Sequence, residues 1–116
     1  MPNRLNKVLR SIADPTRREI FNLLIVASTA LSITQIADQF DISRQGITKH
    51  LKILQQAGLL DMSSQGRERY CMANAGPLKE VRDWVMHYEQ FWDDKLNRLE
   101  KYLTRGKKQN PGEQTI

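Results

Sequence analysis

Apolar residues recur every three or four positions along four stretches of the first 58 residues. This spacing places them on one face of a helix, so the pattern predicts helices over residues 4–13, from 15 to about 27, over 32–40 and over 43–58. The expected buried stripes are Leu5, Val8, Leu9 and Ile12 in the first helix; Ile20, Leu23, Leu24 and Ala27 in the second; Ile33, Ile36, Ala37 and Phe40 in the third; and Ile47, Leu51 and Leu54 in the fourth.

Capping residues stand where three of these helices would begin. Asp14 precedes Pro15, and proline suits the first helical position because an N–H there would have no intrahelical acceptor. Ser32 and Gln35 have the spacing of a capping box. Ser43 can accept from the free N–H groups in the first turn of the fourth helix. The caps therefore support the same boundaries as the apolar spacing.

After Gly58, which stands where a glycine commonly ends a helix, the pattern changes to that of strands. Residues 60–62 and 69–72 alternate apolar and polar side chains, and residues 63–66 have the composition of a turn. We therefore predict a β-hairpin with Arg67 and Arg69 at or near its tip.

The longest predicted helix covers about residues 78–103 and begins after the helix-breaking pair Gly76-Pro77. Its apolar residues are spaced by three or four throughout, as in a coiled-coil seam. A small domain is too short to cover such a helix, so we predict a homodimer, with a monomer that exposes the helix as the alternative. The polar residues 104–116 indicate a flexible tail. The expected dimer contacts are Leu5, Leu9, Val85, Tyr88, Trp92, Leu96 and Leu99.

Two short helices joined by a turn and followed by a hairpin are typical of a winged helix-turn-helix. We therefore expect a mostly helical fold with a small β-hairpin, in the order of four helices, two strands and one long helix. A chain of 116 residues is long enough for one core. Residues 1–103 should form one DNA-binding domain whose last helix, about 78–103, dimerises.

The fourth predicted helix has a polar face opposite its apolar stripe. At about 100° per residue, Gln45, Lys49 and Lys52 lie roughly opposite the stripe, with Arg44 and Thr48 beside it. Arg and Lys recognise guanine in the DNA major groove, and Gln recognises adenine. The face therefore indicates a recognition helix, although a solvated surface helix has a similar pattern.

Charge and cysteine content agree with a double-stranded DNA partner and a cytoplasmic protein. The formal net charge is +5, and residues 44–69 contain five basic residues against two acidic ones. The single cysteine, Cys71, excludes an internal disulfide framework. No signal peptide or membrane-spanning run is visible, so no membrane partner is expected. Neither a catalytic set nor a cofactor motif is recognisable, so we expect no enzyme activity and no cofactor.

Four motifs, taken in order, resemble the ArsR/SmtB family of bacterial winged-helix repressors. This resemblance implies a dimer that binds operator DNA and is released by an effector, which remains unknown. By analogy, Arg44, Gln45, Thr48 and Lys49 read bases, and Arg67 and Arg69 act from the wing. With Ser43 and Lys52, these residues form the predicted DNA-binding set. The motifs are Ala13-Asp14-Pro15-Thr16-Arg17-Arg18; Leu31-Ser32-Ile33-Thr34-Gln35-Ile36-Ala37; Ser43-x-x-x-Ile47-Thr48-Lys49-His50-Leu51-Lys52-x-Leu54-x-x-Ala57-Gly58-Leu59; and Gly66-Arg67-x-Arg69-Tyr70.

The sequence departs from the metal-sensing members of that family. Residues 32–40 contain no cysteine, and the last helix offers only Asp83 and His87, four positions apart. A solvated Asp–His pair is the simpler interpretation, with a metal-responsive repressor as an alternative. A winged-helix module that binds protein and not DNA is another. Cys71 is expected to be a structural thiol, with a redox sensor as its alternative.

Overall fold

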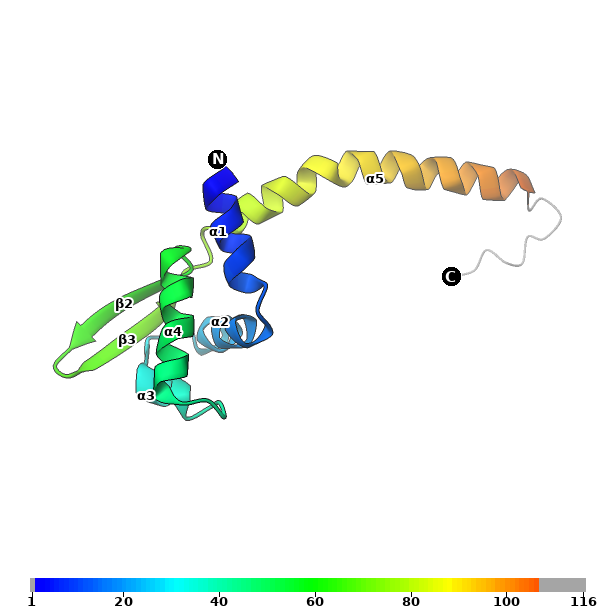
Figure 1. Cartoon of the computed structure of the whole chain (residues 1–116). Coiled ribbons are helices and arrows are strands. Elements are labelled where there is room, and N and C mark those ends of the chain that lie inside the picture. Colours follow the sequence, from blue (N-terminus) through cyan, green and yellow to red (C-terminus); the bar gives the residue numbers. More distant parts are fainter. Residues whose placement is uncertain (1, 107–116) are drawn as a thin grey trace. The chain divides into compact units, whose positions relative to one another are not determined.

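The computed structural model describes residues 2–106, which form five helices and three short strands (Figure 1). A first compact unit extends to Val81, and a second begins at Arg82 within the last helix. The elements are α1 (Pro2–Ile12), α2 (Pro15–Ala27), β1 (Leu31–Ser32), α3 (Ile33–Ala37), α4 (Arg44–Gln56), β2 (Leu60–Gln65), β3 (Glu68–Ala73) and α5 (Leu78–Gly106).

The hydrophobic core lies in the first unit and joins all the predicted stripes. Val8, Ile20, Ile36 and Leu51 are fully buried in it, so each of the first four helices contributes to one cluster. Phe21 is also buried, although the expected stripe of α2 did not include it, while Leu23 and Ala27 are only partly buried. The buried face of α2 is therefore rotated slightly from the predicted one, towards Phe21 and away from Leu23 and Ala27.

The three predicted N-caps are confirmed. Asp14 Oδ2 accepts from the backbone N–H of Arg17 at 3.0 Å, and Ser43 Oγ accepts from that of Gly46 at 3.0 Å. Ser32 and Gln35 form the full capping box of α3. At the other end of α4, Gly58 has a φ of 81°, a left-handed conformation that glycine adopts without strain.

The capping box yields a first prediction. Replacing Ser32 by Ala removes the acceptor for the Gln35 N–H, which lies 3.0 Å from Ser32 Oγ. We expect the free energy of unfolding to fall by about 1–2 kcal/mol, measured by urea denaturation. Ser63→Ala, on the exposed part of β2, serves as the control and should change stability little. Equal stability of the two variants would contradict this role of the box.

The three strands form one antiparallel sheet in the order β1-β3-β2. The two-residue strand β1 was not predicted, because it is too short to show an alternating pattern. The predicted turn at 63–66 is wrong: β2 extends to Gln65, and Gly66 and Arg67 form the turn. Ser63, Ser64 and Gln65 are exposed strand residues, and their polarity resembles that of a turn.

The last helix begins at Leu78 as expected but continues to Gly106. Residues 104–106 therefore belong to α5 and not to the predicted tail, and residues 107–116 lie outside the described chain. Leu78 and Val81 pack against the core, and Glu80 forms an ion pair with Arg4 of α1 at 2.8 Å. From Arg82 to Thr104 every side chain of α5 is exposed.

Candidate nucleic-acid interface

Helix α4 has two chemically different faces. Ile47, Leu51 and Leu54 are all 0% exposed, which fixes the rotation of the helix about its axis. Arg44, Gln45, Lys49 and Lys52 are exposed, as the helical geometry predicted. In Figure 1, α4 follows the short helix α3 after a loop formed by residues 38–43. The pair therefore presents a basic and amide-bearing surface to solvent, which suits contacts with base edges and phosphates.

Two of the predicted base-reading side chains are also bonded within the protein. Arg44 Nη1 donates to Thr34 Oγ1 of α3 at 2.8 Å, and Thr48 Oγ1 donates to the Arg44 carbonyl at 2.9 Å. A guanidinium has five N–H groups, and the bond to Thr34 uses only one of them. Arg44 can therefore still donate to DNA. Thr34 thus positions Arg44, a role that the sequence did not suggest.

The arginines at the start of α2 have a structural role. Arg17 Nε donates to the Ser11 carbonyl at 2.6 Å, and Arg18 Nη1 donates to the Ile12 carbonyl at 2.7 Å. Both acceptors belong to the end of α1, where carbonyls lack intrahelical partners, so these side chains cap α1. The backbone N–H of Arg17, together with its positive charge, lowers the pKa of Asp14.

His50 lies on the inner part of α4 and contacts Arg17. Its Nδ1 is 3.4 Å from Arg17 Nη1, and its side chain is partly buried. The contact joins α4 to the arginine that caps α1. His50 therefore acts in packing between helices.

The wing places both of its predicted arginines in solvent. Arg67 is in the two-residue turn, and Arg69 is paired in register with Ser64 on β2. Arg69 Nη2 lies 3.8 Å from Met62 Sδ, a weak contact that leaves the guanidinium exposed. These two cations extend the basic surface from the tip along the outer part of the hairpin.

Cys71 is a core residue. It is 0% exposed and lies in the hydrophobic cluster. Burial raises the pKa of its thiol to about 11, and the nearby positive charge of Arg69 offsets this only in part. A buried, protonated thiol reacts slowly with oxidants, so the structural role is favoured over redox sensing.

The raised pKa of Cys71 predicts a pH dependence of stability. The buried thiol stays protonated to about pH 11, whereas the unfolded thiol ionises near 9.0. Its stabilising contribution is thus complete below pH 9 and is lost as the pH rises towards 11. Between pH 8 and 10, wild type should lose about 1 kcal/mol more unfolding free energy than Cys71→Ala, measured by urea denaturation. Parallel pH profiles for the two proteins would contradict a buried thiol.

Asp83 and His87 do not form a metal site with other residues of the described chain. Asp83 Oδ1 pairs with the neighbouring Arg82 at 3.2 Å, and the His87 ring lies edge-on to Tyr88. Within residues 2–106, no three His, Cys, Asp or Glu side chains come together as ligands. The structure therefore adds no support for the metal-responsive alternative.

The second unit is an exposed helix with a broad apolar face. Tyr88, Trp92, Leu96 and Leu99 are 42%, 50%, 62% and 52% exposed, respectively. The rings of Tyr88 and Trp92 stack with their centroids 6.4 Å apart. In the first unit, by contrast, Leu5 is buried and Leu9 is partly buried within their own chain. Leu5 therefore has little surface left for a partner.

Comparison with known proteins agrees with this architecture. A helix-turn-helix domain family model matches residues 12–63. The transcriptional repressor SdpR of Bacillus subtilis (strain 168) is 33% identical over 92 residues, which cover 79% of this chain and 100% of SdpR. A crystal structure of an ArsR family transcriptional regulator has a TM-score of 0.73 at 28% identity and covers 80% of this chain and 94% of that one. An ArsR-like transcriptional regulator from Rhodococcus sp. RHA1 has a TM-score of 0.68 at 29% identity, with 86% and 92% covered.

The fold is thus a winged helix-turn-helix, with α3 and α4 as its helix pair and β2–β3 as its wing. The chain belongs to the ArsR family of transcriptional regulators. No helix within residues 2–106 is both long and apolar enough to cross a bilayer.

Proposed function

We propose that this regulator is a homodimeric repressor that binds a palindromic operator in the cytoplasm, without enzymatic activity. The observation that carries the proposal is the arrangement of α4. Its apolar stripe is fully buried, and this holds Arg44, Gln45 and Lys49 on the outer surface of the first unit. An α-helix of this kind fits the major groove of DNA.

The proposed contacts divide into two kinds. Base edges are read from the first turns of α4, by Arg44, Gln45, Thr48 and Lys49. Ser43, Lys52, Arg67 and Arg69 contact the phosphate backbone, with the wing arginines reaching DNA beside the groove that α4 occupies. All five cations in the two sets are exposed, which supports their access to DNA: Arg44, Lys49, Lys52, Arg67 and Arg69.

The proposed domain division assigns the first unit and α5 to different tasks. The first unit binds DNA, and the exposed apolar face of α5 pairs with a second copy of the chain. Val85, Tyr88, Trp92, Leu96 and Leu99 lie along that face, and burying it against an identical helix removes large apolar side chains from water. Leu9, which is partly buried, keeps part of its surface for the partner, whereas Leu5 stays in its own core.

Fluorescence anisotropy with a labelled fragment of the gene's own upstream region tests this function. We expect tight binding to the native fragment, weak binding to a scrambled one and a steep decrease of affinity with salt. Equal weak binding to both fragments would contradict the proposal and would favour the protein-binding alternative.

A zinc series in the same assay tests the metal-responsive alternative. Because Asp83 and His87 have no third ligand in the described chain, zinc should leave the affinity unchanged. Release of DNA by zinc, abolished in His87→Ala, would establish metal sensing.

A further inference from the structure

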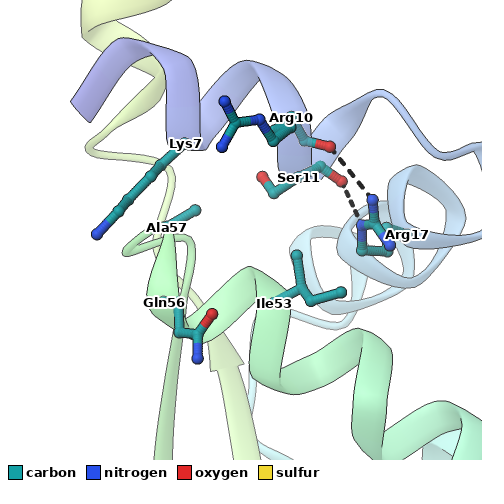
Figure 2. A pocket seen from close by; sticks show the side chains of 7 residues that line it. All are labelled: Lys7, Arg10, Ser11, Arg17, Ile53, Gln56 and Ala57. Carbon is teal, nitrogen blue, oxygen red and sulfur yellow. Dashed lines mark hydrogen bonds between the residues drawn. The ribbon is translucent and has the colours of Figure 1, made fainter. Parts of the chain in front are cut away.

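A cavity of about 310 Å³ lies within the first unit, between α1, α2 and α4 (Figure 2). Lys7, Arg10 and Ser11 line it from α1, and Arg17 lines it from α2. Ile53, Gln56 and Ala57 line it from the end of α4. Its volume is at the lower end of the range that holds small organic ligands.

The charge of the cavity has one sign. Three of its lining residues are basic, and no acidic side chain lines it. Within residues 2–106, neither the Lys7 ammonium nor the Arg10 guanidinium forms an ion pair, since the ion pairs there join Arg4 to Glu80 and Arg82 to Asp83. Two cations thus border the cavity without a counter-charge, so an anion entering it would be attracted.

The floor of the cavity is apolar. Ile53 is 39% exposed, although it lies on a helix whose other large apolar residues are fully buried. Figure 2 shows Ile53 on α4, and Ala57 at the C-cap of that helix, facing the segment of α1 that contains Arg10 and Ser11. A ligand that covers Ile53 would therefore gain hydrophobic contact beside the two cations.

We propose that this cavity binds a small organic monoanion with an apolar body, such as a medium-chain or aromatic carboxylate. The anionic group bonds to Arg10 and Lys7, and the apolar part lies on Ile53 and Ala57. Gln56 offers an amide at the rim for a second polar contact. The lining favours a ligand that has both a negative charge and an apolar body. A neutral ligand would leave the cations unpaired, and a purely polar anion would leave Ile53 uncovered.

The cavity is connected to the DNA-binding surface through two routes. Ile53 belongs to the same helix as Arg44 and Lys49, and Ala57 is the C-cap of that helix. Arg17 bonds to the Arg10 and Ser11 carbonyls and also contacts His50 of α4. An anion that attracts Arg17 competes with these bonds, and it neutralises positive charge on the DNA-binding unit. This step rests on the proposed function, and it predicts that the anion lowers operator affinity by about fivefold or more.

The binding test uses the full chain and no DNA. Octanoate and benzoate are titrated into ¹⁵N-labelled protein, with octanol and benzamide as neutral counterparts, and amide shifts are followed by NMR. We expect saturable shifts at Ile53, Gln56 and Ala57 at roughly millimolar carboxylate, and much smaller shifts with the neutral compounds. Absent saturation, or equal shifts with the neutral compounds, overturns the site.

Charge-removing variants distinguish this site from a DNA-backbone contact. Arg10→Gln and Lys7→Gln are at exposed positions and should fold normally, yet each should weaken octanoate binding at least fivefold. Lys79→Gln, an exposed cation outside the cavity, is the matched control. Variants that bind octanoate like wild type but bind DNA more weakly would show that these cations serve DNA, and would overturn the proposal.

The connection to DNA is measured separately in the anisotropy assay. Octanoate should release the operator fragment, whereas octanol should not. Saturable octanoate binding with unchanged operator affinity would refute the connection and leave the site standing. If the chain binds no operator at all, the NMR titration still decides whether the cavity takes the anion.

Discussion

Replacing Arg44 and Lys49 together by Ala is expected to abolish sequence-specific operator binding while leaving the fold and the dimer intact. Both side chains are exposed on α4 and neither belongs to the hydrophobic cluster; within residues 2–106, the only side chain to which Arg44 bonds is the exposed Thr34. Each good base contact contributes about 1–3 kcal/mol of discrimination, so the pair should cost about 2–6 kcal/mol. This corresponds to a loss of at least ~30-fold in affinity for the native fragment.

The control for this experiment removes the same charge elsewhere. Lys79→Ala with Lys101→Ala also deletes two cations, both at exposed positions of α5. General electrostatic attraction falls in both double variants, whereas only the α4 variant loses the preference for native over scrambled DNA. If the α4 variant keeps that preference, α4 is not the reading element.

Replacing Trp92 and Leu96 together by Glu is expected to convert the dimer to a folded monomer. These side chains are half or more exposed in the single chain, so the core of the first unit does not depend on them. Two carboxylates in an apolar seam would be desolvated on association, which opposes pairing. Light scattering should report half the wild-type mass, and circular dichroism should show a folded first unit.

Loss of the dimer should also weaken DNA binding by a large factor. Two linked reading units gain about 10²–10⁴ in avidity over one, so the monomer should lose at least 100-fold in operator affinity. Gln90→Glu with Asn97→Glu adds the same charge on the opposite side of α5 and should remain a dimer. A seam variant that stays dimeric would place the interface elsewhere.

The predictable parts of the fold are those where one local signal dominates. The buried stripe of α4 was predicted because Ile47, Leu51 and Leu54 follow the helical period between a serine cap and a glycine stop. The same helical period predicted the buried face of α2 only in part. It missed Phe21, whose burial depends on which elements the helix packs against. The prediction ended the β2 strand too early, because the polar residues of a solvated wing have the same composition as a turn.

The parts that the sequence did not predict depend on contacts between distant residues. Arg17 and Arg18 lie in the first turn of α2, where the helix dipole disfavours cations, and the sequence alone shows this. It does not show their acceptors, which are carbonyls of α1. Thr34 beside Arg44 is a similar case, since ten positions separate them. The cavity combines α1, α2 and α4, and no motif marks Lys7, Arg10 or Gln56 as its lining.

The most direct test of the central claim is a hydroxyl-radical footprint of the wild-type protein on its upstream fragment. Two α4 helices related by the dimer axis should protect two half-sites whose centres lie about one helical turn, ~34–36 Å, apart. The protected sequences should be inverted repeats of each other. A single protected segment, or protection without any repeat, would contradict a dimer that reads DNA through α4.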